Sequence, residues 1–270
     1  MSEFIYCLNT STIQPTPLLD KVRIAGQAGY QALEPWNDEI NQYIEHGGSL
    51  ADLKSALTDA GLAVASVVAL RGWADSEGEA FAEALEDCRR LMDQAAFLES
   101  PHVVASPPEG RVNLEQTTRR YAQLLHLGRQ VGVKPAMEFL GFSEGVNTLA
   151  QALAIAEGTE DPDASVVADV FHLMRGPGSI DDLLTLSSDR LAIVHVNDLP
   201  RSPAPGEQTD ADRILPGDGI ADLPCVIAHL RSIGYQGALS LELFNRDLWA
   251  QDPAEVAVRG LDRLRALVEG

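Results

Sequence analysis

Short apolar runs alternate with longer amphipathic stretches along the chain. The apolar runs are rich in Val, Ile, Leu or Ala and lack a clean polar alternation, which is typical of strands buried on both faces of a parallel sheet. We expect eight such strands, at residues 4–9, 31–34, 63–69, 102–105, 134–139, 165–171, 191–197 and 238–244.

The amphipathic stretches between these runs predict helices. They cover residues 17–28, 50–60, 79–98, 114–131, 149–157, 220–233 and 253–268. Several of them end directly before a glycine, as at Gly29, Gly61, Gly132 and Gly234. A glycine at this place supplies the left-handed residue that closes a helix, so the order helix, glycine, strand recurs along the chain.

Eight strands alternating with helices predict either a closed barrel or a doubly wound sheet. A dinucleotide-binding sheet would carry GxGxxG after its first strand, and the segment CLNTSTIQPT lacks this motif. We therefore predict an α/β fold in which residues 1–270 form a single (β/α)8 TIM barrel, although length alone would also allow two small domains. The irregular residues 199–210 follow the seventh strand and are expected to form a loop over the active-site mouth.

Composition and charge narrow the range of partners. The formal net charge of −20 argues against nucleic acid, because phosphate backbones require clustered Lys and Arg. Three widely spaced cysteines without a CxxC motif favour a reducing compartment, and the N-terminal residues resemble neither a signal peptide nor a membrane span. We expect a cytoplasmic protein that binds neither nucleic acid nor membrane. The oligomeric state is left open, and a homo-oligomer is compatible with the sequence.

Ionisable residues interrupt four of the apolar runs near their C-terminal ends. They are Glu138 in AMEF, Asp169 in VVADVFH, His195 in IVHVND and Glu242 in LSLELF, with Glu34 in ALEPW a weaker fifth. In a TIM barrel the loops that follow this end of the strands build the active site. Any one of these residues alone could be a carboxylate paired with a neighbouring Lys or Arg.

Taken together, the four residues indicate a metal site. Charged groups are rarely fully buried without a partner, and a closed barrel would bring all four strand ends to one point. Three carboxylates and an imidazole can share a small site when a cation balances their charge. An oxygen-rich set with one histidine fits Mn²⁺, Mg²⁺, Co²⁺ or Zn²⁺, so we predict one divalent metal ion as the cofactor.

The same motifs carry a family resemblance over nearly the whole chain. AMEF, ADVFH, HVND followed by PGDG, and SLELF occur in the order and spacing of the xylose-isomerase-like sugar isomerase/epimerase superfamily. The C-terminal third and the early CLNTST segment resemble its inosose isomerase branch most closely. The ordered set is specific for the superfamily and much less so for a substrate.

The resemblance implies roles for the four strand-end residues. Glu138, Asp169, His195 and Glu242 would bind the metal. Glu138 and Glu242 would also flank the substrate and exchange the proton on a carbon next to a carbonyl. This agrees with elementary chemistry, since a metal that polarises a carbonyl and its adjacent hydroxyl lowers the cost of an enediolate.

Four further residues are candidate substrate contacts. His172 resembles the substrate-binding histidine of the family, with a role in orienting Asp169 as the alternative. Arg213 resembles an arginine that grips a substrate oxygen, and an ion pair with Asp212 or Asp218 is the alternative. Glu144 lies where related ketose epimerases place a substrate contact, or is a solvated loop carboxylate. Trp36 could form a wall of the pocket, because sugars stack on aromatic rings, or belong to the core.

We therefore predict an enzyme, a metal-dependent isomerase or epimerase of a small sugar or polyol such as an inosose or ketose. A lyase of the inosose dehydratase type is the main alternative, because its first step is the same proton abstraction. An endonuclease IV-like nuclease is disfavoured, since the third and fourth strand ends, VVALRGW and VVASPPE, lack its extra histidines. A non-catalytic binding module is disfavoured by the intact ligand set. The sequence does not choose among the metals or decide whether the substrate is phosphorylated.

Overall fold

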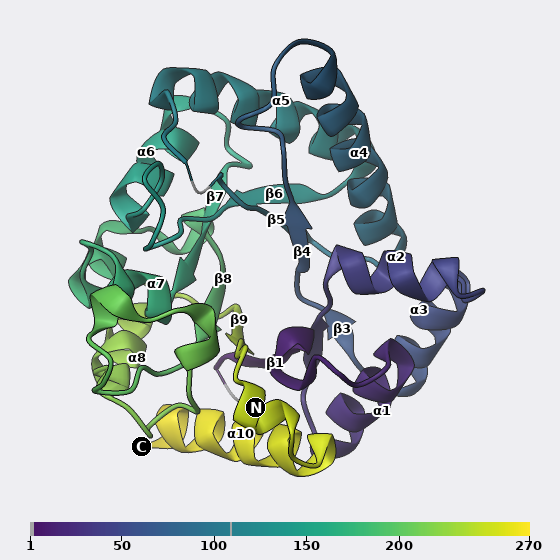
Figure 1. The fold of residues 1–270 in the computed structure, drawn as a ribbon, viewed down its shortest axis with the longest axis vertical. Helices are drawn as coiled ribbons and strands as arrows, with labels where there is room; N and C mark the ends of the chain where they lie inside the picture. The colour runs from purple at the N-terminus through teal and green to yellow at the C-terminus, as the bar shows by residue number, and fades with distance from the viewer. Residues whose placement is uncertain (1–2, 109) are drawn as a thin grey trace.

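Parallel strands form a ring at the centre of the molecule in a computed structural model, which describes residues 3–108 and 110–270 (Figure 1). Hydrogen bonding joins nine strands in the order β3-β2-β1-β9-β8-β7-β6-β5-β4. The strands are β1 (Ile5–Asn9), β2 (Ala32–Glu34), β3 (Ala63–Val64), β4 (Val67–Leu70), β5 (His102–Ala105), β6 (Lys134–Met137), β7 (Ser165–Asp169), β8 (Leu191–Val196) and β9 (Ala238–Leu241).

The first and last strands in this order, β3 and β4, follow each other closely in the sequence. β3 pairs with β2 and β4 pairs with β5, and only Ala65 and Ser66 separate β3 from β4. The backbone N–H of Val68 donates to the carbonyl of Pro35 at 3.0 Å, which continues the pairing past the interruption. If β3 and β4 are counted as one interrupted strand, the nine named strands form a nearly closed barrel of eight strands. The predicted TIM barrel is confirmed.

Helices surround this ring (Figure 1). They are α1 (Leu18–Ala28), α2 (Asn37–Glu45), α3 (Leu50–Asp59), α4 (Gly78–Phe97), α5 (Leu114–Val131), α6 (Leu149–Gly158), α7 (Val170–Arg175), α8 (Leu223–Ser232), α9 (Arg246–Trp249) and α10 (Pro253–Glu269). Gly29 and Gly132 have φ angles of 95° and 85°, as predicted for residues that close helices. None of the described helices is both long and apolar enough to cross a membrane.

Three short helices differ from the expected pattern. The hydropathy pattern did not predict α2 or α9, and residues 170–171, which were expected in a strand, begin α7. The strand ends at Asp169 because its carboxylate caps α7, accepting a hydrogen bond from the backbone N–H of His172 at 3.0 Å. An apolar strand that runs directly into an apolar helix leaves no change in hydropathy to mark the boundary.

The barrel interior is built in layers. A core of small apolar residues fills its lower part, comprising Cys7, Ala32, Val68, Ala69, Val104, Ala136, Val167, Ile193 and Ala238. Side chains two positions further along a strand face the same side. That step leads from Ala136 to Glu138, from Val167 to Asp169 and from Ile193 to His195. The ionisable residues thus form the layer directly above the apolar core.

Candidate metal centre and active site

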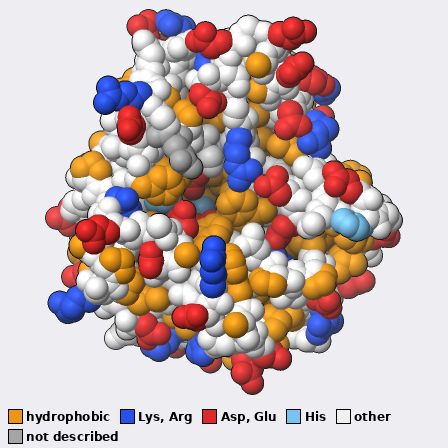
Figure 2. Space-filling model, in the orientation of Figure 1, with side chains coloured by type: hydrophobic (Ala, Val, Ile, Leu, Met, Phe, Trp, Pro, Cys, Tyr) orange, Lys and Arg blue, Asp and Glu red, His pale blue; other side chains and the backbone are white. Residues whose placement is uncertain are grey.

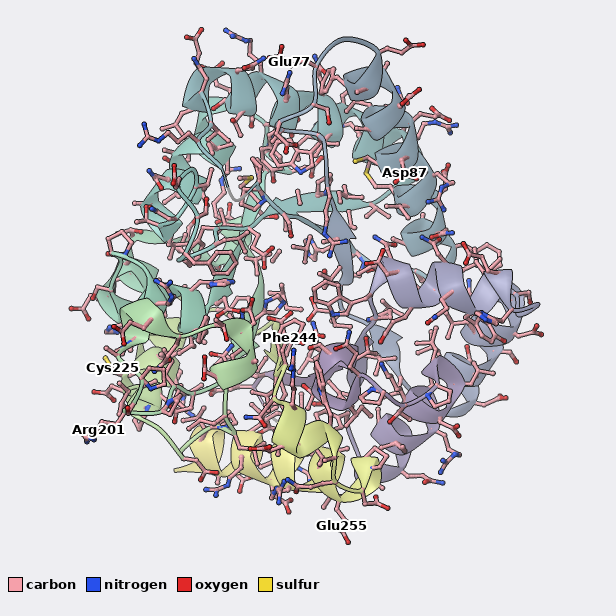
Figure 3. All side chains as sticks on the ribbon, viewed as in Figure 1. Glu77, Asp87, Arg201, Cys225, Phe244 and Glu255 are labelled. Atoms are coloured by element: carbon pink, nitrogen blue, oxygen red, sulfur yellow. The ribbon has the colours of Figure 1, made fainter. Side chains whose placement is uncertain are left out.

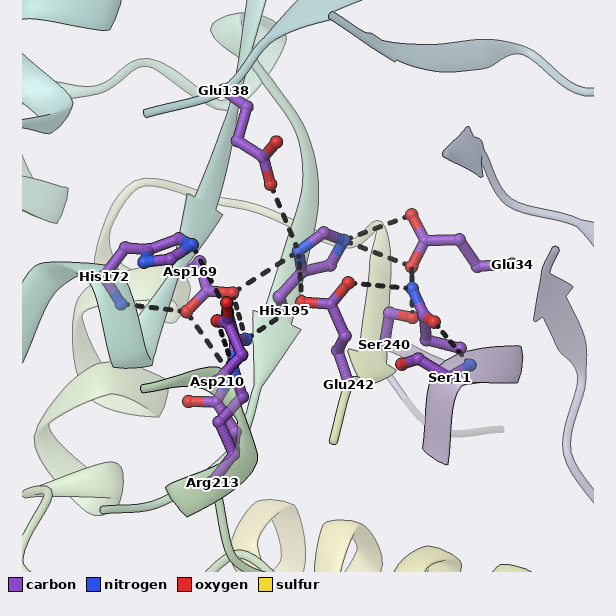
Figure 4. A network of polar contacts seen from close by, with 12 residues as sticks. Ser11, Glu34, Glu138, Asp169, His172, His195, Asp210, Arg213, Ser240 and Glu242 are labelled. Carbon is purple, nitrogen blue, oxygen red and sulfur yellow. Dashed lines mark hydrogen bonds and ion pairs between the residues drawn. The ribbon is translucent and has the colours of Figure 1, made fainter. Parts of the chain in front are cut away.

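The four strand-end residues predicted to share a site lie together, and all of them are buried. Asp169 and His195 are 0% exposed, Glu242 is 3% exposed and Glu138 is 6% exposed. Their side chains point toward one another from β7, β8 and the ends of β6 and β9 (Figure 4). The closed barrel therefore brings together residues that are up to about a hundred positions apart in sequence.

His195 lies at the centre of the group. Its Nδ1 atom is 3.2 Å from an oxygen of Glu242, 3.5 Å from Asp169 and 4.0 Å from Glu138. Ligand atoms of Asp169, His195 and Glu242 all lie within 4.8 Å of one another. This spacing allows one small cation to contact all three, with Glu138 at the edge of the set.

Two further observations fit a cation. Although three carboxylates surround it, His195 Nδ1 makes no hydrogen bond of acceptable geometry to any described residue. The Nδ1 atoms of His102 and His172 also lack a hydrogen bond, so the distinctive feature of His195 is the three carboxylates around its Nδ1, an arrangement that a cation would satisfy. The residues present, three carboxylates and one imidazole, also suit a divalent ion chemically.

Glu34 lies behind the imidazole, on the side away from the three carboxylates (Figure 4). Glu34 is 0% exposed, and its Oε1 atom lies 3.1 Å from His195 Nε2, within hydrogen-bonding distance. Asn9 Nδ2 and Ser240 Oγ donate to Glu34 Oε2 at 2.9 and 2.6 Å. Burial opposes ionisation, but His195, Ser240 and Asn9 hold the pKa of Glu34 below its ordinary value. Burial opposes protonation of His195, but Glu242, Glu34 and Asp169 raise its pKa well above the ordinary value, so the imidazole can carry a proton on both nitrogens. A bound cation would displace the proton on Nδ1, and an ionised Glu34 would then hold the remaining proton on Nε2 and leave the Nδ1 lone pair to the ion.

Arg213 approaches the centre from the loop before PGDG and is only 1% exposed. Its Nη1 atom lies 2.6 Å from Asp169 and 2.9 Å from Glu242, and its Nη2 lies 2.7 Å from Asp210. The alternative of an ion pair with Asp212 or Asp218 is wrong: Asp212 accepts hydrogen bonds from Thr209, and Asp218 pairs with Arg263. Arg213 and a protonated His195 balance part of the buried negative charge, and a divalent cation at this centre would balance more of it.

The carboxylates of the site titrate differently from one another. Burial, reinforced by the charges of Glu242 and Asp169, raises the pKa of Glu138 to about 7, although His195 and the hydroxyl of Ser106 favour its ionised form. Burial also raises the pKa of Glu242. For Asp169, burial acts in the same direction, but Arg213 and His172 hold the pKa well below its usual value. Asp169 thus stays a fixed anion, while Glu138 can gain or lose a proton near neutral pH.

His172 forms part of the wall beside this group. It is 2% exposed, and burial, with Arg213 nearby, lowers its pKa to about 4. Its Nε2 lies 3.3 Å from Arg213 Nη2, and its ring packs edge-on against Phe139, Phe142 and Phe171. A neutral imidazole in this setting can accept a hydrogen bond from the guanidinium or from a bound hydroxyl group.

A cavity of about 310 Å³ opens above the site. It is lined by residues that include Glu138, His172, Arg213, Glu242 and Trp36. The space-filling view along the barrel shows the hollow at the centre of this face (Figure 2). The rings of Trp36 and Phe244 meet edge-on at 5.7 Å on one wall. The volume suits a small ligand, and the mixture of aromatic and charged groups suits one with both apolar faces and hydroxyls.

Glu144 is the one predicted site residue that the structure places away from the cavity. Its side chain is 70% exposed and forms an ion pair with Arg111. The sequence analysis also did not single out Asn9, Ser106 or Asp210. Asn9 ends β1 and donates to both Glu34 and Glu242, so its place at a strand end was a usable signal. Ser106 lies in a loop without any marking pattern, whereas Asp210 begins the short 3-10 helix η5 (Asp210–Asp212) at the end of the segment predicted to lie over the active-site mouth.

The geometry defines a TIM-barrel protein with a buried carboxylate–histidine centre at the C-terminal mouth of the barrel. Residues 22–267 match the family described as the xylose isomerase-like TIM barrel, and the chain belongs to this family. An inosose isomerase from Halalkalibacterium halodurans is 28% identical over 94% of this chain and 92% of its own. The prediction of an enzyme of this superfamily is confirmed by such relatives.

The chain is also similar to a dehydratase and to solved structures with the same fold. A 3-dehydroshikimate dehydratase from Pseudomonas putida is 24% identical over 93% of this chain, which corresponds to 40% of that protein. Among solved structures, an IOLI protein with a binding zinc atom superposes with a TM-score of 0.91 at 24% identity, covering 98% of each chain. A D-psicose 3-epimerase solved in the presence of D-fructose gives a TM-score of 0.78 at 17% identity, covering 99% of this chain and 100% of its own.

Proposed function

We propose that this protein is a divalent-metal-dependent isomerase or epimerase of a small sugar or inositol-derived ketone. The observation that carries the proposal is the convergence of three carboxylates and a free imidazole nitrogen at the floor of a small cavity. The full-length similarity to inosose isomerases supports the class of substrate. We also propose that the chain acts in the cytoplasm.

In this proposal Glu138, Asp169, His195 and Glu242 hold the metal. When bound, the ion would polarise a substrate carbonyl and its adjacent hydroxyl and make the neighbouring C–H more acidic. The zinc atom in the related IOLI protein supports zinc as one candidate, and the carboxylate-rich set also suits Mn²⁺, Mg²⁺ or Co²⁺. Asp169 contributes a permanent negative charge, because Arg213 keeps it ionised.

Glu138 and Glu242 carry the proton in this proposal. Both line the cavity, and burial raises the pKa of each, so each is a stronger base than an exposed carboxylate. One removes the proton from the carbon beside the carbonyl, and the same or the other returns it to a neighbouring atom or to the opposite face. The hydroxyl of Ser106, 2.5 Å from Glu138, holds that carboxylate in position.

The remaining lining residues bind and orient the substrate. Arg213 and His172 present polar atoms to the cavity and are positioned to hold substrate hydroxyl or carbonyl oxygens. Trp36 is fixed by a 2.8 Å hydrogen bond from its Nε1 to Asn9 and offers an apolar face to a sugar ring.

A dehydratase acting on a related cyclic ketone is the second candidate. The similarity to 3-dehydroshikimate dehydratases favours it, and its first step uses the same base. The two functions differ in whether a β-hydroxyl group then leaves.

Incubation with a panel of inososes and ketoses in D₂O tests the proposal. We expect one compound to gain deuterium at the carbon next to its carbonyl in the presence of metal, and to keep its mass otherwise. Loss of 18 mass units from the product would assign the dehydratase. Absence of both deuterium uptake and dehydration across the panel would refute proton transfer at this site.

A further inference from the structure

A second cluster of metal-binding side chains lies on the outside of the barrel. Cys225 and His229 belong to α8, and Asp181 belongs to the short 3-10 helix η2 (Ile180–Thr185) that precedes β8. One ligand atom from each of the three lies within 4.8 Å of the other two. Cys225 lies at the edge of the molecule, whereas Phe244 of the active-site cavity lies near its centre (Figure 3).

Local structure holds these side chains in place. Cys225 and His229 are four residues apart on one helix and so share a face. His229 is mostly buried, with its side chain 15% exposed. Ser179 and Asp182 form a capping box at the start of η2, so the carboxylate of Asp182 is used in the cap. The carboxylate of the neighbouring Asp181 instead contacts His229 of α8.

The distances are close to those of a zinc site. Cys225 Sγ is 3.3 Å from His229 Nε2, which is 2.9 Å from Asp181 Oδ1. Tetrahedral zinc, with bonds of about 2.3 Å to sulfur and 2.0 Å to nitrogen or oxygen, sets its ligand atoms roughly 3.3–3.6 Å apart. These two distances are therefore within a few tenths of an ångström of the zinc spacing, and the 77%-exposed side chain of Asp181 has room to adjust its distance to Cys225.

The charge around the thiol also favours a cation. Among the described residues, no Lys or Arg pairs with Asp181. Asp222 caps the start of α8 and accepts a hydrogen bond from the backbone N–H of Cys225 at 3.1 Å, so a second carboxylate lies close to the cluster.

We propose that Asp181, Cys225 and His229 form a second metal site that takes Zn²⁺ or a similar borderline-soft cation. A thiolate and an imidazole select such ions over Mg²⁺ or Ca²⁺, and three protein ligands leave one position for water. The ion ties η2 to α8 on the outside of the barrel. This site is independent of the proposed catalytic metal and of the reaction.

Cobalt substitution tests the site with a readout that the catalytic centre does not give. Co²⁺ bound by a thiolate shows a sulfur-to-metal charge-transfer band in the near ultraviolet, whereas the ligands of the barrel centre are carboxylates and an imidazole. We expect metal-depleted wild-type protein to develop this band on adding Co²⁺. Cys225→Ser should lose it, and Cys88→Ser, which changes a buried thiol elsewhere, should keep it.

Zinc stoichiometry and affinity complete the test. Cys225→Ser and His229→Ala should each bind one equivalent of zinc fewer than wild type, and Asp181→Ala should weaken this site at least about tenfold. His195→Ala should keep the cobalt band even if the barrel centre binds no metal, which separates the two proposals. A wild-type protein without the band at saturating Co²⁺, or a Cys225→Ser variant that retains it, would overturn the assignment.

Discussion

Glu34→Gln is the sharpest test of how the centre is organised. Asn9 and Ser240 both donate to Glu34 Oε2, so a glutamine must keep its carbonyl oxygen at that position. Its amide nitrogen then takes the place of Oε1 and presents N–H groups to His195 Nε2. The imidazole would respond by moving its proton to Nδ1, the atom that faces the three carboxylates.

The magnitude follows from the contact that is lost. A hydrogen bond to a buried charged group contributes about 1.5–3 kcal/mol, which corresponds to roughly 10- to 100-fold in an equilibrium constant. The same range is typical when the partner of a metal-binding histidine is replaced. We therefore expect Glu34→Gln to weaken metal binding about 10- to 100-fold without changing the shape of the site.

Competition titration against a chelator measures this affinity directly. Glu144→Gln is the matched control, since it makes the same chemical change in an exposed side chain outside the cavity. Thermal melting of the metal-depleted variants would show that both remain folded. If folded Glu34→Gln bound metal as tightly as wild type, the role of Glu34 in fixing the imidazole tautomer would be refuted.

Three other predictions concern catalysis, metal dependence and stability. Glu138→Gln and Glu242→Gln should each lower kcat at least about 10²-fold while circular dichroism stays unchanged, and near-normal turnover in either would remove it from proton transfer. Chelation should abolish activity and His195→Ala should reduce metal content by elemental analysis, whereas full activity in excess EDTA would contradict a catalytic metal. Burial, together with Lys134, lowers the pKa of His102 to about 4, so the folded state takes up fewer protons than the unfolded state and stability falls as pH drops from about 6.5 to 4. In urea unfolding, His102→Gln should reduce the fall in the free energy of unfolding between pH 6.5 and 4 by up to about 3 kcal/mol. The same pH dependence in the variant and the wild type would contradict this role of His102.

The sequence predicted the barrel and the members of its central group well. Apolar strands that alternate with amphipathic helices leave few topologies, and a charge inside a buried run is costly enough to imply a partner. This is why Glu138, Asp169 and His195 could be placed together before any contact was known. Their position one layer above the apolar core became visible only in the structure.

The contacts that tune the site were much harder to foresee. The sequence marked Arg213 as a candidate substrate contact, with an ion pair to Asp212 or Asp218 as the alternative, but not its contact with Asp169, 44 positions away. Ser106 lies in a loop and Asp210 begins the short 3-10 helix η5 (Asp210–Asp212), and the paths of both segments depend on packing that no local pattern encodes. The short helices α2 and α9 were missed because each is held by tertiary contacts rather than by a long amphipathic period.

The buried guanidinium of Arg213 also bears on the order in which the centre would be completed. Because it contacts both Asp169 and Glu242, the barrel contains an internal counter-ion that does not depend on a dissolved metal. Uptake of the proposed ion would then be a late step on an ordered scaffold, separate from the folding of the chain.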